Sequence, residues 1–152
     1  MTEQIQGLEQ VRAILKTHRT IAVLGASTDR FRAGFYVPDY MHQQGYRIFP
    51  VNPNHVGATA WGEPFRATLA ELAGQPIDIL DVFRLPELLP RHLPEILAMQ
   101  PRPKLVWFQQ GIRNDEVAKA LLAEGIGVAQ DRCLLADHRR LELGPLEPEP
   151  SA

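Results

Sequence analysis

Residues 20–32, with the sequence TIAVLGASTDRFR, decide the fold. Their first part, Thr20 to Leu24, is a short apolar run that ends in Gly25, which is typical of a strand buried on both faces of a sheet. The polar remainder leads into apolar residues at helical spacing from about Gly34 to Gln44, and Gly45 follows as a stop signal. A strand, a polar loop and a helix in this order predict the first unit of a parallel α/β fold.

Strands and helices continue to alternate along the chain. Four further apolar runs predict strands at Tyr46–Val51, Ile77–Phe83, Leu105–Phe108 and Ile126–Ala129. Helices are predicted at Gly7–Thr17, Ala67–Leu72, Leu85–Met99 and from an N-cap at Asn114 to Glu124. Pro90 and Pro94 lie inside the third of these segments, so this helix is expected to be kinked or to begin late.

The alternation predicts one α/β domain over residues 1–143. We expect a Rossmann-like fold with a five-stranded parallel sheet and helices on both faces, because parallel strands need crossover connections. Residues 144–152 contain three prolines and two glutamates and are predicted to form a disordered tail.

The composition narrows the classes of partner. The chain has 152 residues, 45% of them hydrophobic, which is enough for one buried core. Its formal net charge of −2 disfavours general binding to nucleic acid or to an anionic membrane. We recognise no export signal and no apolar run of membrane-spanning length. The single cysteine, Cys133, fits a reducing compartment, so a cytoplasmic location is expected.

The loop after the first strand is a candidate phosphate site. In an open parallel sheet, ligands bind outside the carboxyl ends of the strands. This loop offers backbone amides and two hydroxyls ahead of a helix N-terminus, whose partial positive charge suits a pyrophosphate, and Arg30 and Arg32 add cations. It lacks the G-x-G-x-x-G pattern, and a polar turn with solvated arginines is the alternative interpretation.

The residues at the end of the second strand help to distinguish between two classes of cofactor. A site for NAD usually places Asp or Glu there, to accept the ribose 2′-hydroxyl. Here Asn52-Pro53 stands at that position, so no carboxylate would repel the 3′-phosphate of coenzyme A (CoA). An Asx-Pro turn that merely ends the strand explains the same residues.

Two more strand ends could border a ligand. Phe83 and Arg84 supply an apolar face and a cation after the third strand, although the local sequence alone favours a core phenylalanine and a solvated arginine. Gln110 and Gly111 supply an amide and a flexible backbone step after the fourth strand.

Cys133 and His138 raise the question of thiol chemistry, because a neighbouring imidazole activates a cysteine. A buried, inert cysteine and a helix-end histidine paired with Asp137 are the simpler interpretation. The five histidines show no ligand spacing and one cysteine cannot build a zinc cage, so no metal is expected.

Taken together, several segments resemble the small stand-alone CoA-binding domain family, which is related in fold to the nucleotide domain of the succinyl-CoA synthetase α-subunit. The matching segments are residues 21–27 (IAVLGAS), 45–53 (GYRIFPVNP), 78–84, 106–111 and 131–133 with His138. The resemblance implies that CoA binds across the strand ends, with phosphates at residues 25–28, adenosine near residues 52–53 and pantetheine near residues 110–111. The cofactor-binding residues expected from the loops and the resemblance are Gly25, Ala26, Ser27, Thr28, Arg30, Arg32, Val51, Asn52, Pro53, Phe83, Arg84, Gln110 and Gly111.

The expected function is non-catalytic binding of CoA or an acyl-CoA, as a sensor or carrier, since no convergent acid-base set is recognised. The partner is then a small molecule, and the apolar lead-in helix could support a homodimer. Two enzymatic alternatives stay open, an NAD(P)-linked oxidoreductase and a thiol-chemistry enzyme that uses Cys133. A protein that keeps this fold without a ligand is a third alternative.

Overall fold

Five parallel strands form the central sheet of the computed structural model, which describes residues 4–148. They are β1 (Thr20–Leu24), β2 (Arg47–Val51), β5 (Ile79–Val82), β6 (Leu105–Phe108) and β7 (Gly127–Ala129). Their order in space is β2-β1-β5-β6-β7. From β1 the chain first adds β2 on one side and then β5, β6 and β7 on the other, so the strand order reverses between β1 and β5. This confirms the predicted parallel α/β fold.

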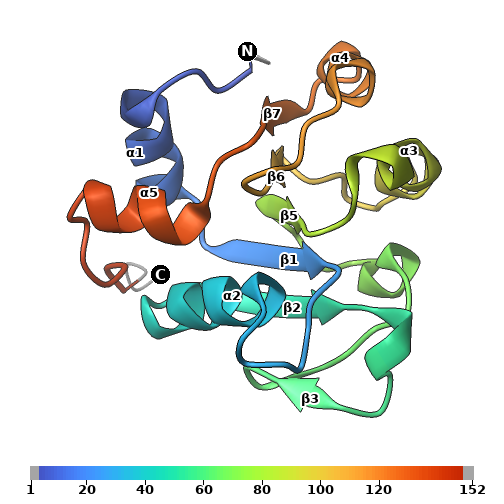
Figure 1. The fold of residues 1–152 in the computed structure, drawn as a ribbon, viewed down its shortest axis with the longest axis horizontal. Coiled ribbons are helices and arrows are strands. Elements are labelled where there is room, and N and C mark those ends of the chain that lie inside the picture. The colour runs from blue at the N-terminus through green and yellow to red at the C-terminus, as the bar shows by residue number, and fades with distance from the viewer. Residues whose placement is uncertain (1–3, 149–152) are drawn as a thin grey trace.

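Helices cover both faces of the sheet (Figure 1). On one face lie α1 (Leu8–Thr17), α2 (Ala33–Gln43) and α5 (Leu134–Arg140), with α5 between the other two. On the opposite face lie α3 (Leu89–Leu97) and α4 (Asp115–Ala123). Alternate residues of each strand enter the two cores: Val23 packs with the first group and Leu24 with the second. Among residues 4–148, no helix is both long enough and apolar enough to cross a membrane.

Three segments differ from the sequence prediction. The segment predicted as one helix from Leu85 is divided into a 3₁₀ turn, η3 (Pro86–Leu88), and α3, so the helix begins late, as its prolines indicated. The short helix expected near residue 67 is a 3₁₀ turn, η2 (Leu69–Leu72). The polar loop after Asn52 contains a 3₁₀ turn, η1 (Pro53–His55), and a small hairpin of β3 (Thr59–Ala60) and β4 (Glu63–Pro64). Besides these three segments, α5 is a helix that was not predicted from the sequence.

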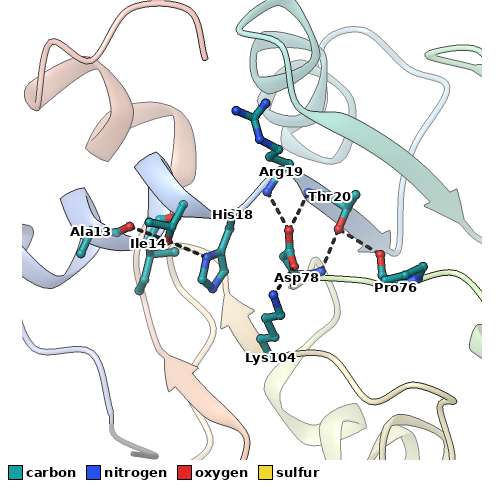
Figure 2. Close-up of polar contacts among 9 residues, drawn as sticks. Ala13, Ile14, His18, Arg19, Thr20, Pro76, Asp78 and Lys104 are labelled. Carbon is teal, nitrogen blue, oxygen red and sulfur yellow. Dashed lines mark hydrogen bonds and ion pairs between the residues drawn. The ribbon is translucent and has the colours of Figure 1, made fainter. Parts of the chain in front are cut away.

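A polar cluster joins the amino ends of the strands, at the edge away from the predicted ligand site (Figure 2). The Asp78 carboxylate accepts hydrogen bonds from the backbone amides of Arg19 at 2.7 Å and Thr20 at 3.2 Å, and lies 3.1 Å from Nζ of Lys104. Burial acts to raise the pKa of Asp78, but these contacts outweigh it, and the pKa is lowered. One carboxylate thereby connects the starts of β1, β5 and β6.

Residues 144–148, the first part of the predicted tail, lie against the domain. Leu146 packs on the core beneath α1, α2 and α5, and its amide donates to the carbonyl of Gln44 at 2.6 Å. The carbonyl of Glu147 accepts from Arg19 at 2.6 Å. The packed chain thus extends five residues beyond the predicted boundary because Leu146 has an apolar surface to bury, and the rest of the predicted tail, 149–152, lies outside the described residues.

Candidate functional site

Two adjoining pockets open at the carboxyl ends of β1, β2 and β5. The first pocket has a volume of about 650 Å³ and the second of about 400 Å³, both within the range typical of small-molecule sites. They share the residues Gly25, Asn52, Asn54 and Arg84. The site therefore lies where the strand order reverses, as the rule for open parallel sheets predicts.

Seven of the predicted site residues line the first pocket, and two more line only the second. The first pocket contains Gly25, Ser27, Thr28, Arg32, Asn52, Phe83 and Arg84, together with Asp29, Ala33, Gly34, Asn54 and His55. The second contains Val51 and Pro53 besides the shared residues, together with Leu24, Ala67, Thr68, His92 and Glu95. The loops after β1, β2 and β5 are thus brought together.

Gly25 lets the chain turn beside β5. Its φ is +91°, and a Cβ placed on it would lie 2.6 Å from the carbonyl oxygen of Phe83. A Cβ on Gly34, in the first turn of α2, would lie 3.0 Å from the carbonyl oxygen of Gly25. Both glycines are therefore needed for the close packing of strand, loop and helix, whether or not a ligand is bound.

The loop after β1 is ordered by its own polar groups. The Ser27 hydroxyl accepts from the amide of Asp29 at 2.9 Å, and the Asp29 carboxylate accepts from the amide of Phe31 at 3.0 Å. Asp29 also lies 3.6 Å from Nε of Arg32, with both side chains largely exposed. The first pocket thus has the cations of Arg32 and Arg84 and the N-terminus of α2, which favour an anion, and the exposed carboxylate of Asp29, which opposes it.

Asn52 connects β2 to the loop after β1. Its Nδ2 donates to the carbonyl of Ala26 at 2.8 Å, and its Oδ1 accepts from the amide of Asn54 at 2.9 Å, which caps η1. The Asx-turn interpretation of the sequence is therefore confirmed, and this turn also shapes both pockets.

Arg84 stands between the two pockets. Its Nε donates to Nε2 of His92 at 3.2 Å, and Nδ1 of His92 lies 2.7 Å from Oε2 of Glu95. His92 and Glu95 were not predicted as site residues, because the prolines around them obscure where α3 begins and which of its faces lines the pocket. Their spacing of three residues on a helix was the available signal.

Glu95 changes the comparison with NAD sites. The end of β2 is neutral, as predicted, but a carboxylate from α3 borders the second pocket beside it. The second pocket therefore has a carboxylate, that of Glu95, even though the end of β2 has none.

Four predicted site residues line neither pocket. Ala26 is fully buried and Arg30 is exposed in the loop after β1. At the end of β6, Gly111 has a φ of +87°, and its amide donates to Oδ1 of Asp131 at 2.6 Å. Gln110 and Gly111 are thus held beside the end of β7, away from the two pockets. Their place beside pantetheine stays a prediction.

Cys133 and His138 also lie outside both pockets. His138 is buried, which lowers its pKa, and its Nδ1 lies 2.8 Å from the hydroxyl of Tyr40. The expected pair of Asp137 and His138 is wrong, because Asp137 accepts from Arg132 at 2.8 Å. Among residues 4–148, no three His, Cys, Asp or Glu side chains gather as metal ligands would.

Asp81, in β5, is the most unusual titratable group of the core. It is buried, and neither carboxyl oxygen has a hydrogen-bond partner within the described part of the chain. Burial raises the pKa of Asp81 well above its ordinary value. Its strand neighbours are Val23 in β1 and Trp107 in β6, so this carboxyl is enclosed in apolar surroundings, which disfavour its charged form.

Comparison with known proteins gives related chains of similar length. A protein of Bacillus subtilis (strain 168), the uncharacterized protein YneT, is 36% identical over 129 residues, which are 85% of this chain and 92% of that protein. Among solved structures, cell-free ID.343 from Thermus thermophilus is 51% identical with a TM-score of 0.84, covering 90% of this chain and 99% of that one. A hypothetical protein from Pyrococcus horikoshii OT3 is 29% identical with a TM-score of 0.79, covering 90% and 93% respectively.

One protein family matches most of the sequence. Residues 19–139 match the family described as CoA binding domain. This range contains all five strands of the parallel sheet and every residue that lines the two pockets. The chain therefore belongs to the CoA binding domain family.

Proposed function

We propose that this protein binds CoA or an acyl-CoA at the carboxyl ends of β1, β2 and β5, without catalysing a reaction on it. The observation that carries the proposal is the pair of adjoining pockets, joined by Arg84, within the part of the chain that matches the family. Two connected pockets suit a ligand with a charged phosphate part and a larger uncharged part.

The first pocket is the proposed site of the phosphates. Arg32 and Arg84 supply cations to it, and the amino end of α2 adds its partial positive charge. The hydroxyls of Ser27 and Thr28 are further hydrogen-bonding groups of the same wall.

The second pocket is the proposed site of an uncharged part of the ligand. Leu24, Val51 and Pro53 give it an apolar wall on which a planar base or an aliphatic arm could pack. Glu95 would repel a phosphate there and could accept a hydrogen bond from an amine or a hydroxyl.

The placement of the reactive side chains supports a non-catalytic role. Cys133 lies outside both pockets, and His138 is engaged with Tyr40. The thiol-chemistry alternative therefore has no support from the geometry. An NAD(P)-linked reaction stays the second candidate, because the Glu95 carboxylate borders the pocket in which a ribose diol would have to bind.

The test is a ligand panel read by thermal unfolding, since a ligand that binds only the folded protein raises its apparent stability. CoA, acetyl-CoA, dephospho-CoA, NAD and NADP are compared at equal concentration. We expect a rise in Tm with CoA and acetyl-CoA, a smaller rise with dephospho-CoA, and none with NAD or NADP. Recovery of CoA and acetyl-CoA unchanged after incubation would support the non-catalytic role, whereas conversion of either would refute it.

The sensor or carrier role, the cytoplasmic location and the homodimer remain predictions. Size-exclusion chromatography with light scattering, with and without CoA, tests the dimer directly.

A further inference from the structure

Arg84 is oriented by a bond that leaves its outer nitrogens available. Its guanidinium carries five N–H donors and no acceptor, and the Nε donor is used by Nε2 of His92 at 3.2 Å. Within residues 4–148, neither terminal nitrogen of Arg84 has a hydrogen bond to the protein. The side chain lines both pockets, so these two nitrogens are the part that a ligand can meet.

His92 is fixed in turn by Glu95. Since Nε2 of His92 accepts from Arg84, the ring proton lies on Nδ1, which donates to Oε2 of Glu95 at 2.7 Å. Both residues lie on α3, three positions apart and hence on one face. The other carboxylate oxygen of Glu95 accepts from the amide of Leu69 at 3.3 Å, which ties the carboxylate to η2.

The two pockets also differ in charge. Glu95 borders the second pocket, whereas the first pocket has Arg32 and the amino end of α2. Asp29, the carboxylate of the first pocket, is exposed and lies close to Arg32. A phosphate bound to Arg84 is therefore favoured on the side of the first pocket, away from Glu95.

We propose that His92 and Glu95 are positioning residues, which hold the guanidinium of Arg84 toward the phosphates of the bound nucleotide. This inference rests on the proposed function. An arginine side chain has several rotatable bonds, and fixing them at the moment of binding would weaken the complex. The hydrogen bond to His92 fixes the Arg84 side chain before the ligand binds. The entropy cost of ordering Arg84 is therefore met when the protein folds and not when the ligand binds.

A double-mutant cycle on CoA binding tests the inference, by isothermal titration calorimetry on the full chain. The cycle consists of wild type, Arg84→Gln, His92→Leu and the double variant. His92→Gln serves as a rescue, because its amide can both accept from Arg84 and donate to Glu95. Arg91→Gln is the matched control, since Arg91 is an exposed arginine on the same helix. Urea unfolding shows that each variant is folded at the temperature of the titration.

We expect Arg84→Gln and His92→Leu each to weaken CoA binding about tenfold, which corresponds to about 1.4 kcal/mol. The double variant should bind no more weakly than Arg84→Gln alone, because His92 acts through Arg84. His92→Gln and Arg91→Gln should bind within about twofold of wild type.

Two other results would overturn the inference in distinguishable ways. Wild-type affinity in His92→Leu, or losses that add in the double variant, would show that His92 does not act through Arg84, while CoA binding itself would stand. A folded wild-type protein that shows no binding of CoA would refute the proposed function and the positioning role with it.

Discussion

At Gly25 the backbone of β1 passes so close to β5 that a Cβ atom has no room. Gly57 has a similar φ of +101°, but apart from its chain neighbours no atom of residues 4–148 lies within 4 Å of the position of its Cβ. A side chain at Gly57 would meet only the strain of a positive φ, whereas a side chain at Gly25 would also clash with Phe83. Comparing substitutions at the two positions therefore distinguishes the two effects.

We predict that Gly57→Ala lowers the free energy of unfolding by about 1–2 kcal/mol, from the positive φ alone. Gly25→Ala should cost at least about 1 kcal/mol more, because the carbonyl of Phe83 must move as well. Urea unfolding of both variants measures the difference. Equal losses would show that the β1 turn can relax away from Phe83.

Asp29 places a negative charge where phosphates are proposed to bind. In Asp29→Asn the side-chain oxygen can still accept from the amide of Phe31, but the charge next to Arg32 is removed. We predict tighter CoA binding at low salt, by up to about fivefold, since both groups are exposed. The gain should shrink at high salt, where the charges are screened. Weaker binding to Asp29→Asn in a titration would mean instead that Asp29 is needed to orient Arg32.

Asp81 is predicted to lower the stability of the protein at neutral pH. Its pKa is raised in the folded state, so at a pH below the unfolded value of about 3.9 the group is neutral in both states and folding has no charge to neutralise. As the pH rises above that value, the unfolded chain ionises first and is favoured.

We therefore expect Asp81→Val to be more stable than wild type at pH 7, by about 1–3 kcal/mol, and to show a smaller gain at pH 4. Urea unfolding at the two pH values measures this. A variant less stable than wild type at pH 7 would show that the Asp81 carboxyl has a favourable partner in the folded protein.

At the scale of the elements, the Asp78 cluster connects three strands at the edge opposite the pockets. Contacts with Arg19, Thr20 and Lys104 outweigh burial and lower the pKa of Asp78. The stabilisation from a lowered pKa is present above the unfolded value and is lost as the pH falls through the folded value.

We predict that Asp78→Asn lowers the free energy of unfolding at pH 7 by about 1–2 kcal/mol, and that the difference from wild type narrows below about pH 4. Glu87→Gln, which changes an exposed carboxylate in η3, should stay within about 0.5 kcal/mol of wild type. A loss of stability in Asp78→Asn that is independent of pH would contradict the electrostatic explanation.

The elements differ in how far the sequence predicts them. The strands are recognisable because both of their faces are buried, which gives continuous apolar runs such as 20–24 and 105–108. The β3–β4 hairpin has two-residue strands and gives no such run. The seven residues of α5 have four polar or charged side chains, and their burial comes from contacts with α1 and α2 that the local sequence does not reveal.

The site was predicted best where a single strand end determines it. Gly25 and Asn52 directly follow β1 and β2, and Arg84 is the second residue after β5. The strand order brings these three strand ends together. His92 and Glu95 reach the site only through the angle at which α3 packs after its prolines, which the sequence does not specify. Gly111 also follows a strand, but β6 lies one strand beyond the point where the strand order reverses.

At the scale of the whole molecule, the order β2-β1-β5-β6-β7 leaves one place where loops diverge and a cleft can form. Both pockets lie there, whereas the polar cluster around Asp78 lies at the amino ends of β1, β5 and β6 (Figure 2). The proposed ligand site and the polar cluster around Asp78 therefore lie at opposite ends of the sheet. We expect substitutions in one of them to leave the other unchanged.

The most direct test of the account is calorimetric titration of the wild-type chain with CoA, followed by the same titration with NAD. We predict saturable binding of one CoA per chain and no measurable binding of NAD at the same concentration. Binding of NAD without binding of CoA would contradict the account, and would assign the two pockets to a dinucleotide.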